Sequence, residues 1–227
     1  GCTPLFNAAQ RGKLEVVRYL SGEAHANVNQ ATTDFGCPHL FVAAQRGDLD
    51  GGRYLHGEAH ANVNQARTDT GATPLYIAAE KGNLDMVRYL AGEGHADVNQ
   101  ATTDDGSTAL YIAAQEGHLN VVRYLAGETH ADVNQARTDH GCTPLIVAAE
   151  MGNLDVVRYL AGEAHADVNQ ATTDGGYTPL YNVAEKGNLD MVRYLAGEAL
   201  ASATRAATVY VSTAPYSSAE KDNLDVD

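Results

Sequence analysis

Residues 141–175 read GCTPLIVAAEMGNLDVVRYLAGEAHADVNQATTDG, and this stretch decides the fold. Thr143 can cap a helix that accepts Pro144 in its first turn, where the missing N–H of proline is not needed. Gly152 suits the end of that helix. Asn153 can then cap a second short helix. The end of the stretch is rich in Asn, Asp, Thr and Gly, which predicts a turn or hairpin.

The stretch is one of six similar copies, which we call units one to six, spaced by 35 residues. The units begin near Gly1, Gly36, Gly71, Gly106, Gly141 and Gly176. Two short helices cannot bury a core alone, but stacked copies can. The sequence therefore predicts one array over residues 1–198. Residues 219–227 match 184–192 at the same spacing, so 199–227 are predicted to be a degenerate connection and a half-unit that caps the C-terminal end.

The units combine Gly-x-Thr-Pro-Leu, Ala-Ala-x-x-Gly, Val-Val-x-x-Leu and Ala-Asp-Val-Asn, and this pattern resembles the ankyrin repeat. The resemblance covers 1–198 strongly and 212–227 weakly. A tetratricopeptide array has a similar period but longer helices, and it lacks the Thr-Pro-Leu start. The resemblance implies an all-α solenoid of helix-turn-helix units with turn or β-hairpin projections.

The chain departs from the family pattern in length and at one recurring position. Each unit has 35 residues rather than the family's 33, with one extra residue after the second helix and one in the hairpin. The longer hairpin is expected to reach further out than usual. The position after Thr-Pro-Leu, usually His in the family, is occupied here by Phe6, Phe41, Tyr76, Tyr111, Ile146 and Tyr181.

The charge balance limits the classes of partner. The chain has 15 basic and 29 acidic residues, a formal net charge of −14. Such a surface disfavours nucleic acids and anionic membranes and attracts basic proteins. No apolar stretch approaches the roughly 20 residues of a membrane span. The three cysteines show no CxxC motif, which predicts free thiols in a reducing compartment, and we expect an intracellular monomer, cytoplasmic or nuclear.

Five histidines occupy the same position of successive units, at His25, His60, His95, His130 and His165. Two ligands of one zinc ion lie only a few ångströms apart, whereas stacked units are separated by about 8–10 Å. The row is therefore interpreted as residues of a connection, where His tolerates unusual backbone angles. His118 is interpreted as a helix cap. No nucleophile, phosphate loop or metal motif stands out, so we expect no catalysis and no cofactor.

Function is expected where the units differ. In the ankyrin family the hairpin tips and the ends of the first helices line the concave face that binds other proteins, and the resemblance implies that role here. In this chain both bands vary between units. The predicted partner-binding residues are Arg11, Phe35, Arg46, Lys81, Asp105, Glu116, His140, Met151, Tyr177 and Lys186.

The band at the helix ends is basic in the first units and acidic later, which suggests a charge-polarised groove for a protein partner. Phe35, His140, Met151 and Tyr177 are the expected anchors, since aromatic and Met side chains are favoured at interface centres. The alternative function is a passive scaffold or spacer segment of a larger protein, with a mixed surface charge and no chosen partner.

Unit two is the expected weak point of the array. Gly51 and Gly52 replace the Val-Val or Met-Val pair of the other units, and CPHL at 37–40 breaks the Thr-Pro-Leu start. Each helical Gly costs roughly 1 kcal/mol in propensity, and each lost Val side chain adds about 1.5–3 kcal/mol. The unit is either a hinge or a decayed copy. We predict faster amide exchange at 48–56 than at 83–91.

Overall fold

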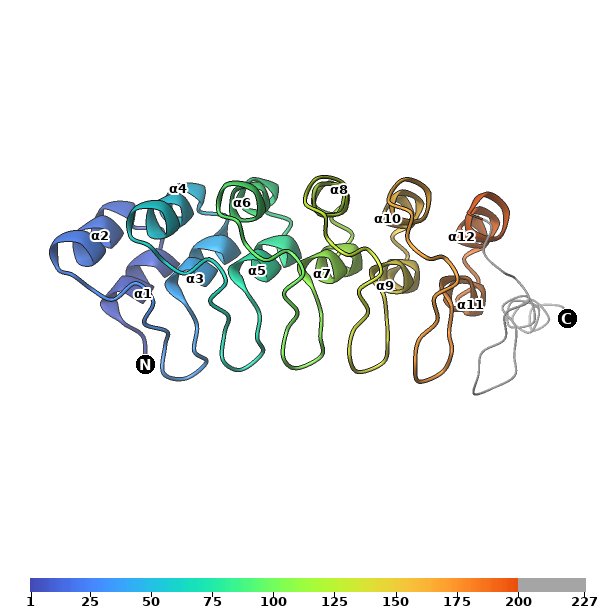
Figure 1. The fold of residues 1–227 in the computed structure, drawn as a ribbon, viewed down its shortest axis with the longest axis horizontal. Coiled ribbons are helices and arrows are strands. Elements are labelled where there is room, and N and C mark those ends of the chain that lie inside the picture. Colours follow the sequence, from blue (N-terminus) through green and yellow to red (C-terminus); the bar gives the residue numbers. More distant parts are fainter. Residues whose placement is uncertain (200–227) are drawn as a thin grey trace, which may run out of the picture.

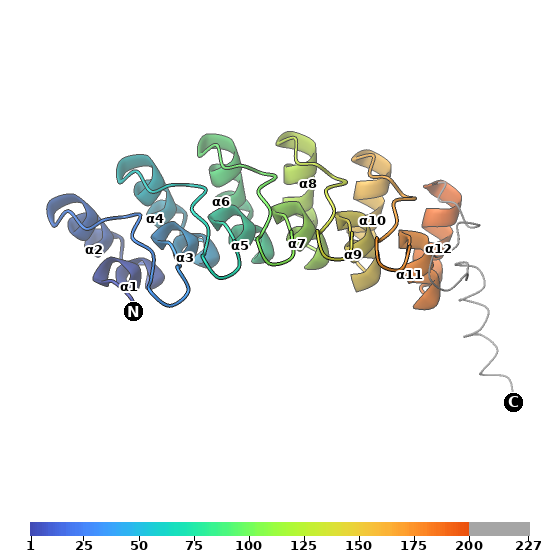
Figure 2. The same ribbon diagram turned by 60° about the horizontal axis from the view of Figure 1, so that its bottom comes forward.

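A computed structural model describes residues 1–199, which form a curved row of helix pairs with loops projecting from one side (Figure 1). The first helices of the units are α1 (Pro4–Gln10), α3 (His39–Arg46), α5 (Pro74–Glu80), α7 (Ala109–Gln115), α9 (Pro144–Met151) and α11 (Pro179–Glu185). The second helices are α2 (Leu14–Arg18), α4 (Leu49–Arg53), α6 (Leu84–Arg88), α8 (Leu119–Glu128), α10 (Leu154–Arg158) and α12 (Leu189–Arg193). The second helices follow the outer side of the curve (Figure 2). The all-α solenoid predicted from the sequence is confirmed.

The predicted start and end of the first helix are confirmed, whereas the predicted cap of the second is wrong. The Thr143 hydroxyl accepts the N–H of Ile146 at 3.2 Å, and Gly152 ends α9 with a left-handed φ of 83°. The Asn153 side chain makes no cap hydrogen bond in α10. It donates instead to the carbonyl oxygens of Ala114 and Gln115 in the preceding unit, both at 2.9 Å. Asn153 therefore joins two units rather than capping the start of α10.

His118 follows the same rule, so its interpretation as a cap is also wrong. Its side chain makes no cap hydrogen bond at the start of α8. Its Nε2 lies 2.9 Å from the carbonyl oxygen of Glu80 in the preceding unit. Histidine thus takes over the bridging task that asparagine performs elsewhere.

The extra residue after the second helix is absorbed inside a helical turn. In units one, two, three, five and six the second helix continues as a π-helical turn, in η1 (Tyr19–Glu23), η2 (Tyr54–Glu58), η3 (Tyr89–Glu93), η4 (Tyr159–Glu163) and η5 (Tyr194–Glu198). π-Helical segments of this kind occur mostly as single turns within α-helices. In unit four α8 remains α-helical through Glu128.

One hydrophobic core runs through the described units between the two layers of helices. The leucine of each Arg-Tyr-Leu is fully buried from unit two to unit six, at Leu55, Leu90, Leu125, Leu160 and Leu195. The Ala-Ala pairs of the first helices are buried as well, for example Ala113 and Ala114. Small side chains at these positions allow neighbouring first helices to pack closely, as α5 does against α7.

The recurring Arg-Tyr forms a ladder along the second-helix side. The guanidinium of Arg123 lies over the ring of Tyr159 in the next unit, 5.3 Å from its centroid. The Tyr159 hydroxyl donates to the carbonyl oxygen of Arg123 at 3.3 Å. The same stacking joins Arg18 to Tyr54, Arg53 to Tyr89, Arg88 to Tyr124 and Arg158 to Tyr194. The recurrence of Arg-Tyr therefore reflects contact between units.

The loops that project from the row, which we call fingers, cover 26–38, 61–73, 96–108, 131–143 and 166–178. They are turns, and no β-strand occurs anywhere in the described 1–199. Each finger bonds to its neighbour through the backbone, as where the N–H of Thr103 donates to the carbonyl oxygen of Thr70 at 2.9 Å. Side chains add to this, since Asn64 Oδ1 accepts the N–H of Asp97 at 2.9 Å. The fingers therefore form a connected wall.

Unit two keeps its helices despite the broken sequence. Gly51 and Gly52 are buried in α4, and a Cβ added to Gly52 would lie 2.8 Å from Cε of Met86 in unit three. The methionine therefore occupies part of the space that a valine side chain would fill. His39, at the position of the usual proline, is fully buried. Its Nδ1 lies 2.7 Å from the Val28 carbonyl oxygen.

Two expectations concern the limits of the chain. The predicted cap within 199–227 lies outside the described residues, apart from residue 199. The helices of residues 1–199 are all too short or too polar to cross a membrane.

Candidate partner-binding groove

Three cavities lie along the row between the fingers and the first helices, and we call the surface that they share the groove. Cavity A, of about 260 Å³, is lined by Cys2, Phe6, Gln10, Thr32, Asp34, Phe35, Cys37, Phe41, Val42, Gln45 and Arg67. Cavity B, of about 210 Å³, is lined by Phe41, Arg67, Thr70, Ala72, Tyr76, Ile77, Glu80, Thr102, Asp104 and Asp105. Cavity C, of about 310 Å³, is lined by Tyr111, Arg137, His140, Cys142, Ile146, Glu150, Thr172, Asp174, Tyr177, Asn182 and Glu185.

Four of the predicted partner-binding residues line these cavities. Phe35 contributes to cavity A, Asp105 to cavity B, and His140 and Tyr177 to cavity C. The Phe35 side chain is 55 % exposed and lies under the Arg67 guanidinium, 5.6 Å from its ring centroid. These four residues come from the fingers, which is the band where the units differ near their first glycine.

The other six predicted residues lie beside the cavities rather than in them. Arg11, Arg46, Lys81, Glu116, Met151 and Lys186 are all exposed at the ends of the first helices. Their preceding neighbours, such as Glu80 and Glu150, line the groove instead. Lys81 Nζ pairs with Glu80 Oε1 at 2.6 Å, so its charge is compensated locally. The positive charge in the first half of this band therefore comes mainly from Arg11 and Arg46.

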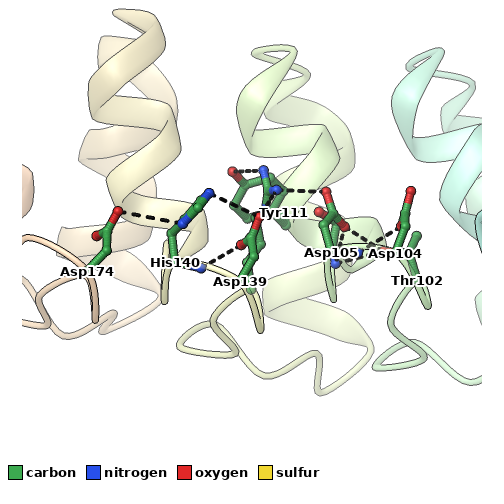
Figure 3. A network of polar contacts seen from close by, with 9 residues as sticks. Thr102, Asp104, Asp105, Tyr111, Asp139, His140 and Asp174 are labelled. Atoms are coloured by element: carbon green, nitrogen blue, oxygen red, sulfur yellow. Dashed lines mark hydrogen bonds and ion pairs between the residues drawn. The ribbon is translucent and has the colours of Figure 1, made fainter.

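A polar network links cavities B and C (Figure 3). Arg137 donates from Nε to Asp139 at 3.1 Å, and its Nη2 lies 3.0 Å from Asp105 Oδ2. Its guanidinium also lies over the ring of Tyr111, 5.5 Å from the centroid. His140 stands between Asp139 and the next finger, with Nδ1 3.6 Å from Asp174. Arg137 thus joins two successive fingers to each other and to α7.

Two carboxylates of the groove, Asp105 and Asp174, are held in their charged form. Burial opposes ionisation of Asp105, but hydrogen bonds from Thr102 and Ser107, together with Arg137, lower its pKa. Hydrogen bonding from Thr172 lowers the pKa of Asp174. The groove therefore presents fixed negative charge at neutral pH.

The family profile described as "Ankyrin repeats (3 copies)" matches residues 1–67, 40–137, 95–172 and 130–207, which together span most of the chain. The chain belongs to the ankyrin repeat family. A search of curated proteins finds no match. Ankyrin repeats generally act as protein–protein interaction modules, and their fold is typically non-catalytic.

The recurring histidines of this ankyrin repeat array are explained by the backbone. All five adopt a left-handed conformation, with φ between 52° and 60°. His is among the residue types that tolerate this region. Each follows the second helix of its unit and turns the chain toward the finger. Groups of three or more His, Cys, Asp or Glu suited to a metal ion are absent from residues 1–199.

The three cysteines of the array are free thiols. Cys2 is exposed, whereas Cys37 and Cys142 lie buried at the same position of different units. Burial raises the pKa of Cys37 and of Cys142 to about 11. The thiolate is the reactive form, so the two buried cysteines act as small apolar side chains.

The sequence analysis did not single out several finger residues that shape the groove, namely Arg67, Arg137, Asp104 and Asp174. A signal for them was present. The finger sequence alternates between ATTD at 31–34, 101–104 and 171–174 and ARTD at 66–69 and 136–139. The position therefore repeats every second unit, which a search for a 35-residue period averages away.

Proposed function

We propose that this protein binds another protein, without catalysis, through the groove between its fingers and first helices. One observation carries the proposal. The three cavities lie along a single face, and each combines finger side chains with side chains from the first helices. A partner segment that follows the groove can insert a side chain into each cavity, as interface anchors do.

The chemistry of the groove supports a protein partner with apolar and basic side chains. Cavity A carries the three phenylalanines Phe6, Phe35 and Phe41. Cavity B has three carboxylates and one arginine in its lining. A net charge of −14 disfavours nucleic acids as partners and attracts basic proteins. We propose binding by a monomer in a reducing intracellular compartment, cytoplasmic or nuclear, where the free thiols are stable.

The test compares two variants with matched exposed side chains. The groove variant carries Phe35→Ser, which alters a side chain of cavity A that is 55 % exposed. The control variant carries Leu189→Ser on a second helix, at 56 % exposure. Each variant of the full chain captures partners from a cell lysate after its thermal unfolding has been shown to match that of the parent.

We expect a protein that is retained by the parent and by the control variant but reduced at least tenfold by the groove variant. Capture that the two variants reduce equally would contradict binding in the groove. The alternative, a passive spacer within a longer protein, predicts that no protein distinguishes the parent from the groove variant.

A further inference from the structure

One finger position alternates between threonine and arginine along the array. It holds Thr32, Arg67, Thr102, Arg137 and Thr172 in successive fingers. The three threonines line cavities A, B and C, respectively. Each cavity therefore includes a finger in which this position is a short side chain.

Where the position is arginine, the chain binds its own guanidinium in a defined site. Arg67 lies over the ring of Phe41 in the first helix of the same unit, 5.5 Å from the centroid, and donates from Nε to Asp69 at 2.9 Å. In the same way, Arg137 lies over the Tyr111 ring and donates to the Asp139 carboxylate. The site thus consists of an aromatic ring from the first helix and the carboxylate two residues after the arginine.

Where the position is Thr102, the same two parts are present without an arginine. Tyr76 is the counterpart of Phe41 and Tyr111, and Asp104 is the counterpart of Asp69 and Asp139. Thr102 turns back to its own finger, donating to Asp105 Oδ1 at 2.7 Å and accepting the N–H of Ser107 at 2.9 Å. Thr102 therefore leaves the Tyr76 ring and the Asp104 carboxylate uncovered, and both groups line cavity B.

The volume and charge of cavity B suit a cationic side chain. Its roughly 210 Å³ is several times the space of one water molecule, about 30 Å³. Arg67, in its wall, is already bonded to Asp69. Asp104 is exposed and accepts the N–H of Asp105, and among residues 1–199 it has no ion-pair partner. Burial and the nearby Asp105, Glu80 and Asp104 carboxylates raise the pKa of Tyr76, consistent with negative charge around its ring.

The other two cavities are less complete copies of this site. In cavity A the corresponding ring, Phe6, already packs against the His39 ring, with centroids 6.2 Å apart. In cavity C the first-helix position is Ile146, which offers no aromatic ring, and Asp174 already faces His140. Cavity B is therefore the best candidate.

We propose that cavity B binds an arginine side chain of the partner protein, with the guanidinium over the Tyr76 ring and paired with Asp104. Cation–π stacking and a carboxylate pair together favour arginine over other side chains. The inference rests on the proposed function, because it names the chemistry of one anchor of a partner bound in the groove.

The first experiment titrates the full chain with the peptide acetyl-Gly-Ser-Arg-Ser-Gly-amide and follows backbone and tyrosine signals by NMR. Two control peptides carry citrulline or lysine in place of arginine. We expect saturable shifts around Tyr76 and Asp104 with the arginine peptide, and at least tenfold weaker binding of the citrulline peptide. Equal binding of citrulline, or tighter binding of lysine, would overturn the proposal.

The second experiment uses a substitution that the chain itself contains in other fingers. Thr102→Arg places an internal guanidinium beside Tyr76 and should weaken the arginine peptide at least tenfold. Thr102→Ser keeps the hydroxyl group and should bind as the parent does. Asp104→Asn, an exposed change that leaves the core intact, should also weaken binding at least tenfold. Unchanged binding by the Thr102→Arg and Asp104→Asn variants would overturn the proposal.

The peptide experiment and the capture experiment distinguish a failure of the arginine site from a failure of the proposed function. A groove-dependent partner whose capture is unaffected by Asp104→Asn would overturn the arginine site and leave the proposed function standing. Peptide binding at Tyr76 with no groove-dependent partner would contradict the proposed function, while the site itself would be supported.

Discussion

On the second-helix side of the array, the arginine–tyrosine contact recurs at every unit, whereas in the groove the arginine–ring contact recurs at every second unit. On the second-helix side, an arginine lies over the tyrosine of the next unit at each of five successive junctions. In the groove, a finger arginine covers the first-helix rings of Phe41 and Tyr111, and no other first-helix ring of residues 1–199 is covered in this way. A contact needed to stack units recurs everywhere, while a position that alternates is not required for stacking.

The largest effect is expected from breaking the uniform side. Tyr159→Ala removes a buried ring, its stacking with Arg123 and its hydrogen bond, and should lower the free energy of unfolding by about 3 kcal/mol. Tyr19→Ala is the matched control, because Tyr19 is 56 % exposed in unit one and should cost less than about 1 kcal/mol. Urea denaturation measures both. Equal losses would show that the ladder contributes nothing to stability.

The second prediction repairs unit two, where the sequence predicts the second-helix side to be weakest. Gly52→Ala gains roughly 1 kcal/mol in helix propensity, and the Cβ displaces only the flexible end of Met86. Combining Gly52→Val with Met86→Val restores the valine packing of the other units and should stabilise at least as much. Hydrogen exchange of the parent should be faster at 48–56 than at 83–91, and slower at 48–56 after repair. Equal protection of the two segments in the parent would contradict a weak second unit.

The third prediction tests whether stability depends on having threonine or arginine at the alternating finger position. Arg137→Thr and Thr102→Arg should each change the free energy of unfolding by about 1 kcal/mol or less, because partly exposed ion pairs and single hydrogen bonds contribute little. Denaturation in urea, compared with Tyr159→Ala, gives the scale. A loss as large as that of the tyrosine would mean that the alternation serves stacking, and the contrast between the two faces would disappear.

The smallest effect concerns acid sensitivity at the junction of units one and two. Burial lowers the pKa of His39, so the unfolded chain, with a His pKa near 6.5, binds a proton first. The stability from neutral His39 is therefore complete above about pH 6.5 and declines as pH falls below it. Pro38→Thr with His39→Pro restores the Thr-Pro-Leu start and should reduce the drop in Tm between pH 7.5 and 5.5.

The same drop in parent and variant would show that His39 does not contribute. The groove carboxylates cannot mimic this effect. The pKa values of Asp69, Asp105, Asp139 and Asp174 are lowered, so the stability that they contribute is lost only when the pH falls below about 4.

The helices and their order could be predicted from the sequence because their signals are local. Thr143 caps α9 and Gly152 ends it, as Thr-Pro-Leu and the later glycine indicate. The roles of Asn153 and His118 could not be predicted in this way. Both stand where a cap is expected, yet their side chains reach a carbonyl group in the preceding unit. That choice depends on a neighbour 38 or 39 residues away.

The candidate groove shows the same division. Sequence variation pointed to the fingers, and Phe35, Asp105, His140 and Tyr177 of the fingers line cavities. It could not show which helix-end residue faces the groove, because one step along a helix turns a side chain by about 100°. The glutamates therefore line the cavities while their neighbours, such as Met151, point outward.

The sequence by itself determined the fold, because each unit carries its own caps, breaks and apolar pattern, and six copies leave stacking as the way to bury them. Only the tertiary structure decided what the constant and the alternating residues do. Arg-Tyr becomes a ladder, and Thr or Arg leaves a groove site open or filled, because both contacts join residues that are distant in the chain, 36 residues apart in the ladder and 26 in the groove, and form only after the chain has folded.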